Sequence, residues 1–293
     1  MNKLIQVSGK IILLGEHFVA YDGKALAGTI NLFLNLNLEK SSRNIVFVNN
    51  RVFSNPTTMK MVEIVSKHLG IKDSFRITIT TQIPLAAGLG SSSAFIVALI
   101  HAFNIYYSFN FDLEKINSTA FIVEKSVSSI ISGVDNTIVT YGGVILFQKN
   151  EFKKITIKQP ISFLVVNTGV LSHTHHVLTE SRKYINENKN RFNQLVEMSN
   201  LLVEQGALAL EQNDLQTLGK LLTENQKLLV ELGVSCREID EIVKLAGMHG
   251  AYGAKLTGAG RGGCVIILAE EYTGLTKLFS DKGYQTIVVE AGV

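Results

Sequence analysis

Apolar and polar residues alternate along several short stretches of the chain, and such alternation predicts β-strands with one buried face. The clearest stretches are residues 32–38 and 75–84, where apolar side chains recur at every second position. Pro84 ends the second stretch, because proline cannot donate to the hydrogen-bond ladder of a sheet. Further strands are expected at residues 144–148, 161–169, 254–257, 264–269 and 284–291.

Helices are predicted between these strands. Asn55 and Pro56 are residue types that open a helix and Gly70 is one that follows a helix end, so we expect a helix between them. Ser235 and Glu238 have the spacing of a capping box, which predicts that another helix begins there. Further helices are expected at residues 91–107, at 113–131, through most of 174–232, and between the expected strands 264–269 and 284–291.

The chain is long enough for two domains. Its 293 residues are 46% hydrophobic and 18% charged, a composition typical of a globular protein with a substantial core. Charged and turn-forming residues gather in the stretch KNEFKK, and Gln159 and Pro160 follow it. We place the domain boundary there, which gives expected domains at residues 1–159 and 160–293.

Composition and charge restrict the kinds of molecule that the protein is expected to bind. The net charge of +3 is too weak to indicate nucleic-acid binding, whereas it suits an anionic small molecule. Cys236 and Cys264 have neither disulfide-framework nor zinc-site spacing, and they fit a reducing cytosol. The sequence shows no signal-peptide pattern and no apolar run near the roughly 20 residues of a membrane span. We therefore expect a cytoplasmic protein that binds neither nucleic acid nor membranes.

The stretch KLTGAGRGGC contains the spacing G-x-G-x-x-G, formed by Gly258, Gly260 and Gly263. This spacing occurs in dinucleotide-binding loops, in protein-kinase glycine loops and in plain turns. A dinucleotide-binding loop leads into a helix, but here the apolar stretch CVIILA follows, which argues against an NAD-dependent oxidoreductase. Too few residues follow Gly263 for the remaining lobe of a protein kinase. We expect a turn between two strands.

The stretch PLAAGLGSSSA, residues 84–94, joins an expected strand to an expected apolar helix. Gly88 and Gly90 allow close backbone approaches, and three serines place free N–H groups and hydroxyls at the start of the helix. That end of a helix carries a partial positive charge and binds phosphates. The lysine of a Walker A loop is absent, so the alternatives are a different phosphate loop or a glycine turn with a serine N-cap.

Three stretches, in this order, resemble the motifs of the GHMP kinases, the family of galactokinase, homoserine kinase, mevalonate kinase and phosphomevalonate kinase. They are SGKIILLGEHFVAYDGKALA, PLAAGLGSSSA and KLTGAGRGGC, and SGVDNTIVTYGG also fits the family. The first and third are most similar to the mevalonate kinase forms. The resemblance covers essentially the whole chain. It implies an α+β fold of two domains, the N-terminal one like domain 2 of ribosomal protein S5 and the C-terminal one ferredoxin-like, with ATP and substrate in the cleft between them.

The resemblance also implies an activity. This activity is the ATP-dependent phosphorylation of the 5-hydroxyl of mevalonate, which gives 5-phosphomevalonate for isoprenoid biosynthesis and uses Mg²⁺. One alternative is another small-molecule kinase of the family, acting on phosphomevalonate, the 3-hydroxyl of mevalonate, homoserine or a sugar. The other is an inactive ligand-binding homologue, which would be expected to lack the catalytic residues present here. A homodimer is left open.

The same resemblance assigns catalytic roles to Asp135 and Lys10. Asp135 is implied to accept the proton of the substrate hydroxyl, while Lys10 contacts this carboxylate and the developing alkoxide. By residue type alone, Asp135 could equally be a helix cap and Lys10 a surface charge. Mg²⁺ is implied to bind Glu124 and the hydroxyl of Ser92. The alternative for Glu124 is the exposed face of a helix, next to Lys125.

Nucleotide and substrate sites follow from the resemblance as well. The residues implied to bind ATP are Pro84, Ala86, Ala87, Gly88, Leu89, Gly90, Ser91, Ser92 and Ser93, and those implied to bind the substrate are Glu16, His17, Ser132, Asp135, Thr174, Gly258 and Ala259. Two features stay open. His173, His175 and His176 are metal-ligand types whose spacing fits no standard zinc site. Arg261 stands where mevalonate kinases more often have glycine, and both a solvated loop residue and a phosphate contact fit it.

Overall fold

The computed structural model describes residues 4–128, 131–172 and 174–293. Its residues form two compact units, each built from separate pieces of chain. The first unit comprises Met1–Gly9, Leu32–Pro84 and Gly90–Tyr141, and the second comprises Lys10–Asn31, Leu85–Leu89 and Gly142–Val293. The strands β1 (Ile5–Leu14) and β2 (Ala25–Ser41) contribute residues to both units. The domain boundary near residue 159 stays a prediction.

The sheet of the first unit contains parts of β1 and β2, two strands that pair with each other, and three shorter strands. Its strand order is β4 (Arg51–Val52), β3 (Ile45–Val48), β5 (Ser74–Thr81) and β2. β5 runs antiparallel to β2, with Leu34 opposite Thr81, and parallel to β3. The alternation predicted for β5 is confirmed, because Phe75, Ile77 and Ile79 are buried and polar residues lie between them.

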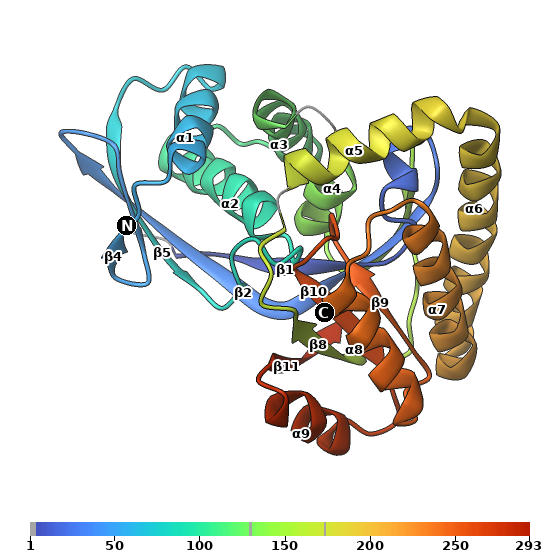
Figure 1. Ribbon diagram of the computed structural model, residues 1–293. Coiled ribbons are helices and arrows are strands. Elements are labelled where there is room, and N and C mark those ends of the chain that lie inside the picture. The colour runs from blue at the N-terminus through green and yellow to red at the C-terminus, as the bar shows by residue number, and fades with distance from the viewer. Residues whose placement is uncertain (1–3, 129–130, 173) are drawn as a thin grey trace. The chain divides into compact units, whose positions relative to one another are not determined.

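Four helices of the first unit pack against one another (Figure 1). They are α1 (Pro56–His68), α2 (Ser91–Tyr106), α3 (Leu113–Val127) and α4 (Val134–Tyr141). The predicted start of α1 is confirmed: the side chain of Asn55 accepts a hydrogen bond from the Thr58 N–H at 3.1 Å. The helix expected at residues 113–131 is shorter than predicted, because Ser128 already has extended backbone angles and ends α3.

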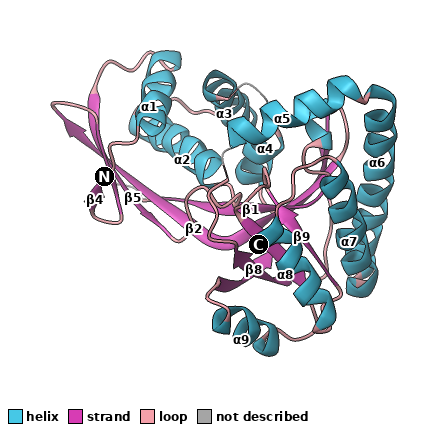
Figure 2. Ribbon diagram, in the orientation of Figure 1, coloured by secondary structure: helices cyan, strands magenta, loops and turns pink. Residues whose placement is uncertain are grey.

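The second unit contains an antiparallel sheet in the order β2, β11 (Gln285–Ala291), β8 (Ile161–Asn167), β10 (Cys264–Leu268) and β9 (Gly253–Thr257). The hairpin of β6 (Val144–Gln148) and β7 (Glu151–Lys154) pairs with β2 through β6. β9 and β10 flank the glycine-rich stretch, so the predicted turn between two strands is confirmed. Figure 2 shows these strands in magenta among the helices.

The helices of the second unit are the short 3₁₀ helix η1 (Phe18–Tyr21), α5 (Thr174–Glu187), α6 (Lys189–Gln212), α7 (Leu215–Glu231), α8 (Arg237–Met248) and α9 (Thr273–Asp281). α7 packs closely on β9. A Cβ atom on Gly253 would lie only 1.7 Å from the carbonyl oxygen of Gly219, so a larger residue does not fit there. Glycine at this point therefore brings α7 next to the strand that leads into the turn.

The predicted capping box at the start of α8 is wrong, although the helix is present. Cys236 is the N-cap residue and its side chain makes no capping hydrogen bond. Ser235 instead donates to a carboxylate oxygen of Asp240 at 2.6 Å and accepts from the amide of Gln226 at 3.2 Å. The Ser235 hydroxyl therefore bonds to Gln226 of α7 and to Asp240 in place of a backbone N–H at the start of α8. Among the described residues, no helix is long and apolar enough to cross a bilayer.

Candidate active site

The start of α2 lies in the first unit and has the form of an anion-binding helix end. Its N-cap is Gly90, in the left-handed region with φ of 82°, and this residue has no side chain with which to cap the helix. The predicted alternative of a serine N-cap is therefore wrong. Ser91, Ser92 and Ser93 form the first turn, and Ser92 is exposed. N–H groups of a first turn lack helical partners, so this end can bind phosphate oxygens.

The loop before α2 belongs to the second unit, where it packs against the glycine turn at residues 258–263. A Cβ atom on Gly88 would lie 2.5 Å from the Thr257 oxygen, and one on Gly258 would lie 2.7 Å from the Gly88 Cα. Both glycines also have positive φ, of 81° and 89°. Two loops that are far apart in sequence thus meet backbone to backbone, which only glycine at both positions allows.

Lys10 lies beside the same loop. Its backbone N–H donates to the Leu89 carbonyl at 3.0 Å, and its side chain is 2% exposed. Lys10 is therefore a buried residue of β1, and the alternative of a surface charge is wrong. Leu89 immediately precedes Gly90, so this hydrogen bond joins Lys10 to the loop that leads into α2.

Glu124 lies on the buried face of α3 and is 8% exposed, which corrects the alternative of an exposed helix face. Its Oε1 accepts a hydrogen bond from the Ser93 hydroxyl at 2.5 Å. In the amide orientation that satisfies its neighbours, Asn136 donates to Oε2 at 3.3 Å. Residues of α2 and α4 thus position the carboxylate of Glu124. Its partner Ser93 directly follows the exposed Ser92. Carboxylate and hydroxyl oxygens are the ligands that Mg²⁺ prefers, so these residues fit that ion.

Asp135 is in the first turn of α4 and is partly exposed. The hydroxyl of Ser132 accepts a hydrogen bond from the Val134 N–H at 3.3 Å, and the Thr137 hydroxyl donates to the Gly133 carbonyl at 2.6 Å. Ser132 therefore satisfies a donor at the helix start, and Asp135 stands one residue inside the helix rather than at its cap.

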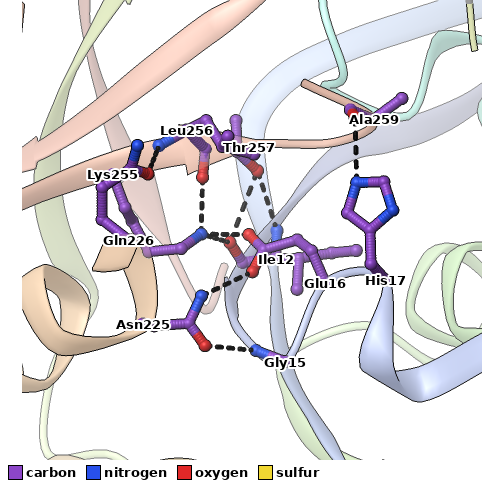
Figure 3. Close-up of polar contacts among 10 residues, drawn as sticks. All are labelled: Ile12, Gly15, Glu16, His17, Asn225, Gln226, Lys255, Leu256, Thr257 and Ala259. Carbon is purple, nitrogen blue, oxygen red and sulfur yellow. Dashed lines mark hydrogen bonds and ion pairs between the residues drawn. The ribbon is translucent and has the colours of Figure 1, made fainter. Parts of the chain in front are cut away.

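Glu16 forms a buried ion pair that the sequence did not indicate (Figure 3). Its carboxylate contacts Nζ of Lys255, and the two side chains are 1% and 0% exposed. The amide of Asn225 donates to the other carboxylate oxygen of Glu16 at 3.2 Å. Burial raises the pKa of Glu16 and lowers the pKa of Lys255, and in both groups burial outweighs the opposite effect of the partner.

The neighbouring His17 faces the glycine turn. Its Nε2 lies 2.8 Å from the carbonyl oxygen of Ala259. Figure 3 shows the ring pointing toward this carbonyl. Burial lowers the pKa of His17 to about 4, and the Ala259 contact opposes this only in part. The imidazole is therefore neutral near pH 7. Because a carbonyl only accepts hydrogen bonds, the proton lies on Nε2 and Nδ1 is the acceptor atom.

The remaining candidates divide between described and undescribed positions. Arg261 pairs with Glu180 of α5, and its Nε donates to the Gly233 carbonyl at 2.9 Å. Its side chain is still 36% exposed, so a solvated loop residue and a phosphate contact both stay predictions. Thr174 begins α5. The structure does not describe His173, nor the side chains of Thr174, His175 and His176.

Among the described side chains, no group of three or more His, Cys, Asp or Glu residues is arranged to hold a metal ion.

Comparisons with known proteins show which family the chain resembles along its length. The GHMP kinases N terminal domain matches residues 56–143, and the GHMP kinases C terminal domain matches residues 207–278. The chain is 31% identical to the mevalonate kinase of Pyrococcus furiosus, over 92% of this chain and 90% of that protein. It is 29% identical to the mevalonate kinase of Methanocaldococcus jannaschii, over 92% of each. It also resembles the crystal structure of L. major mevalonate kinase in complex with R-mevalonate, with a TM-score of 0.84, 28% identity and coverage of 100% and 97%.

Proposed function

The chain belongs to the GHMP kinase family, and from this premise we propose that it transfers the γ-phosphoryl group of ATP to the 5-hydroxyl of mevalonate. The product would be 5-phosphomevalonate, a precursor in isoprenoid biosynthesis. The observation that carries this proposal is similarity to mevalonate kinases along nearly the whole chain, with the family's two-domain fold of mixed α and β content. As a kinase of this family, the protein uses ATP.

We propose a role for each candidate group. The N-terminus of α2 and the preceding glycine loop would bind the triphosphate, since backbone N–H groups there are available to phosphate oxygens. Ser92 and Glu124 would hold Mg²⁺, which supplies charge neutralisation around the phosphates. Asp135 would accept the proton of the acceptor hydroxyl, and Lys10 would stabilise the oxygen as negative charge develops on it.

The residues proposed to contact mevalonate are assigned from the family resemblance. His17, Ser132, Thr174, Gly258 and Ala259 would contact mevalonate, and Glu16 would support this region. The hydrogen bond between His17 and Ala259 joins two of these residues directly. A homodimer and a cytoplasmic location stay predictions.

A coupled ATPase assay with a panel of acceptors tests the proposed function. We expect turnover with mevalonate and only background with phosphomevalonate, homoserine and galactose. Phosphorus NMR of the product should show a phosphomonoester on the 5-position, which distinguishes the 5-hydroxyl from the 3-hydroxyl. Turnover with a sugar but not with mevalonate would assign the chain to another branch of the family, and no turnover with any acceptor would favour an inactive homologue.

Replacing Glu124 by alanine is expected to raise the Mg²⁺ concentration needed for half-maximal activity, because a carboxylate ligand is removed from the site. The measurement is a Mg²⁺ titration of turnover at saturating ATP. Glu114→Ala provides the matched control, since Glu114 is an exposed carboxylate on the same helix. An unaltered titration curve for Glu124→Ala would count against its metal role.

A further inference from the structure

Lys255 carries a buried charge that the proposed chemistry does not use. It lies in the middle of β9, and its side chain is 0% exposed. The neighbouring strand residues Ala254 and Leu256 are buried and apolar. An ammonium group is rarely placed in such surroundings, because its loss of hydration must be offset by protein partners.

Protein acceptors surround this ammonium. Nζ of Lys255 contacts the carboxylate of Glu16, and it donates to the carbonyl oxygens of Leu256 at 2.5 Å and Ile12 at 3.4 Å. A lysine has three N–H donors, so these acceptors match its full capacity. Lys255 is therefore held by the protein itself, and any influence on a substrate must act through another residue.

Glu16 is fixed from its other side as well. Asn225 of α7 donates through its amide nitrogen to Oε2 of Glu16 at 3.2 Å. The amide oxygen of the same side chain accepts from the Gly15 N–H at 3.2 Å. In Figure 3, Lys255 and Asn225 thus approach the segment of Gly15 and Glu16 from two elements, β9 and α7.

The next residue, His17, has a conformation that needs such support. Its φ is 62° and its ψ is −50°, outside the regions that a residue with a Cβ atom normally adopts. Strain of this kind persists only where the surroundings impose it. His17 directly follows Glu16, whose carboxylate is held by Lys255 and Asn225. The His17 ring is hydrogen-bonded to the carbonyl of Ala259, which lies just beyond the end of β9.

We propose that Lys255 is a positioning residue, which acts through Glu16 to fix the backbone at His17 so that Nε2 faces Ala259 and Nδ1 accepts a hydrogen bond from the substrate. This inference rests on the proposed function. Because Nδ1 of a neutral imidazole is an acceptor, the substrate group that fits it is a hydroxyl, which donates, and not a carboxylate.

Kinetic constants of Lys255→Met test the proposal. We expect the KM for mevalonate to rise by about one to two orders of magnitude, since the displaced His17 ring loses one hydrogen bond to the substrate and leaves a buried polar atom unpaired. The KM for ATP should stay within about threefold of the wild type. Lys255→Met/Glu16→Gln serves where the single variant fails to fold, because it leaves no unpaired buried carboxylate. A folded variant with an unchanged KM for mevalonate would overturn the proposal.

Nitrogen NMR of histidine-labelled protein provides a readout that does not depend on activity. In the wild type, the His17 ring should show a protonated Nε2 and an unprotonated Nδ1 at pH 7. In either variant the His17 signals should shift or broaden as the ring loses its fixed orientation. Unchanged His17 signals would overturn the proposal even if the wild type does not phosphorylate mevalonate, and this separates it from failure of the proposed function.

The matched control removes an exposed ion pair from the same unit. Lys277 and Asp281 of α9 are paired at 2.8 Å, with side chains 76% and 64% exposed. Lys277→Met/Asp281→Asn removes the same kinds of charge as the double variant, and its KM values and His17 signals should match the wild type. If this control reproduced the effects of the double variant, general loss of charge would explain them and the positioning role would fail.

Discussion

Replacing Asp135 by alanine is expected to lower kcat by about two orders of magnitude or more, while the KM for ATP changes little. The expected size follows from general-base catalysis, which typically contributes about 10²–10⁴ in rate. Asp135 lies in the first turn of α4 and is partly exposed, a position at which a substrate hydroxyl can approach its carboxylate.

Steady-state kinetics with mevalonate and ATP measure this effect. Asp135→Asn is the matched variant, because it keeps the shape of the side chain and removes the base, and it should lose about as much turnover as Asp135→Ala. A thermal melt of both variants checks that the fold is retained. Turnover of Asp135→Ala within a few-fold of the wild type would remove this residue from the mechanism.

Local patterns in the sequence predict most of the elements. Alternation locates β5, and the Asn55–Pro56 pair locates the start of α1, because each signal depends on residues next to one another in the chain. The capping box fails at Ser235 for the opposite reason. Its hydroxyl bonds to Asp240 and Gln226, and the second of these comes from a different helix.

The candidate site could be predicted where a motif identifies the residue, but not where a distant contact gives the residue its role. Lys255 and Glu16 are 239 positions apart, and no local pattern connects them. The contact of Gly88 with Gly258 likewise depends on how two loops meet in the second unit. For Glu124 the sequence left two alternatives, since the adjacent Lys125 suggested an exposed face, and only packing decided that the carboxylate is buried.

Replacing Lys10 by methionine is expected to lower kcat by about two orders of magnitude or more, again with little change in the KM for ATP. A single donor directed at a developing negative charge typically contributes about 10²–10³ in kcat. Lys10 is 2% exposed, and its backbone bond to Leu89 attaches it to the loop that precedes α2. Methionine keeps a long apolar side chain in this buried position, so the loss should fall on charge rather than packing.

The same kinetic assay decides between two uses of this charge. If the Lys10 ammonium stabilises the acceptor oxygen, Lys10→Met lowers kcat and kcat/KM together, because the interaction is made in the transition state. If it instead binds the triphosphate in the ground state, the KM for ATP rises and kcat is largely kept. Lys40→Met is the control, since Lys40 pairs with Asp73 at 2.9 Å on the surface of the first unit and should leave both constants unchanged. Wild-type constants for Lys10→Met would exclude both uses.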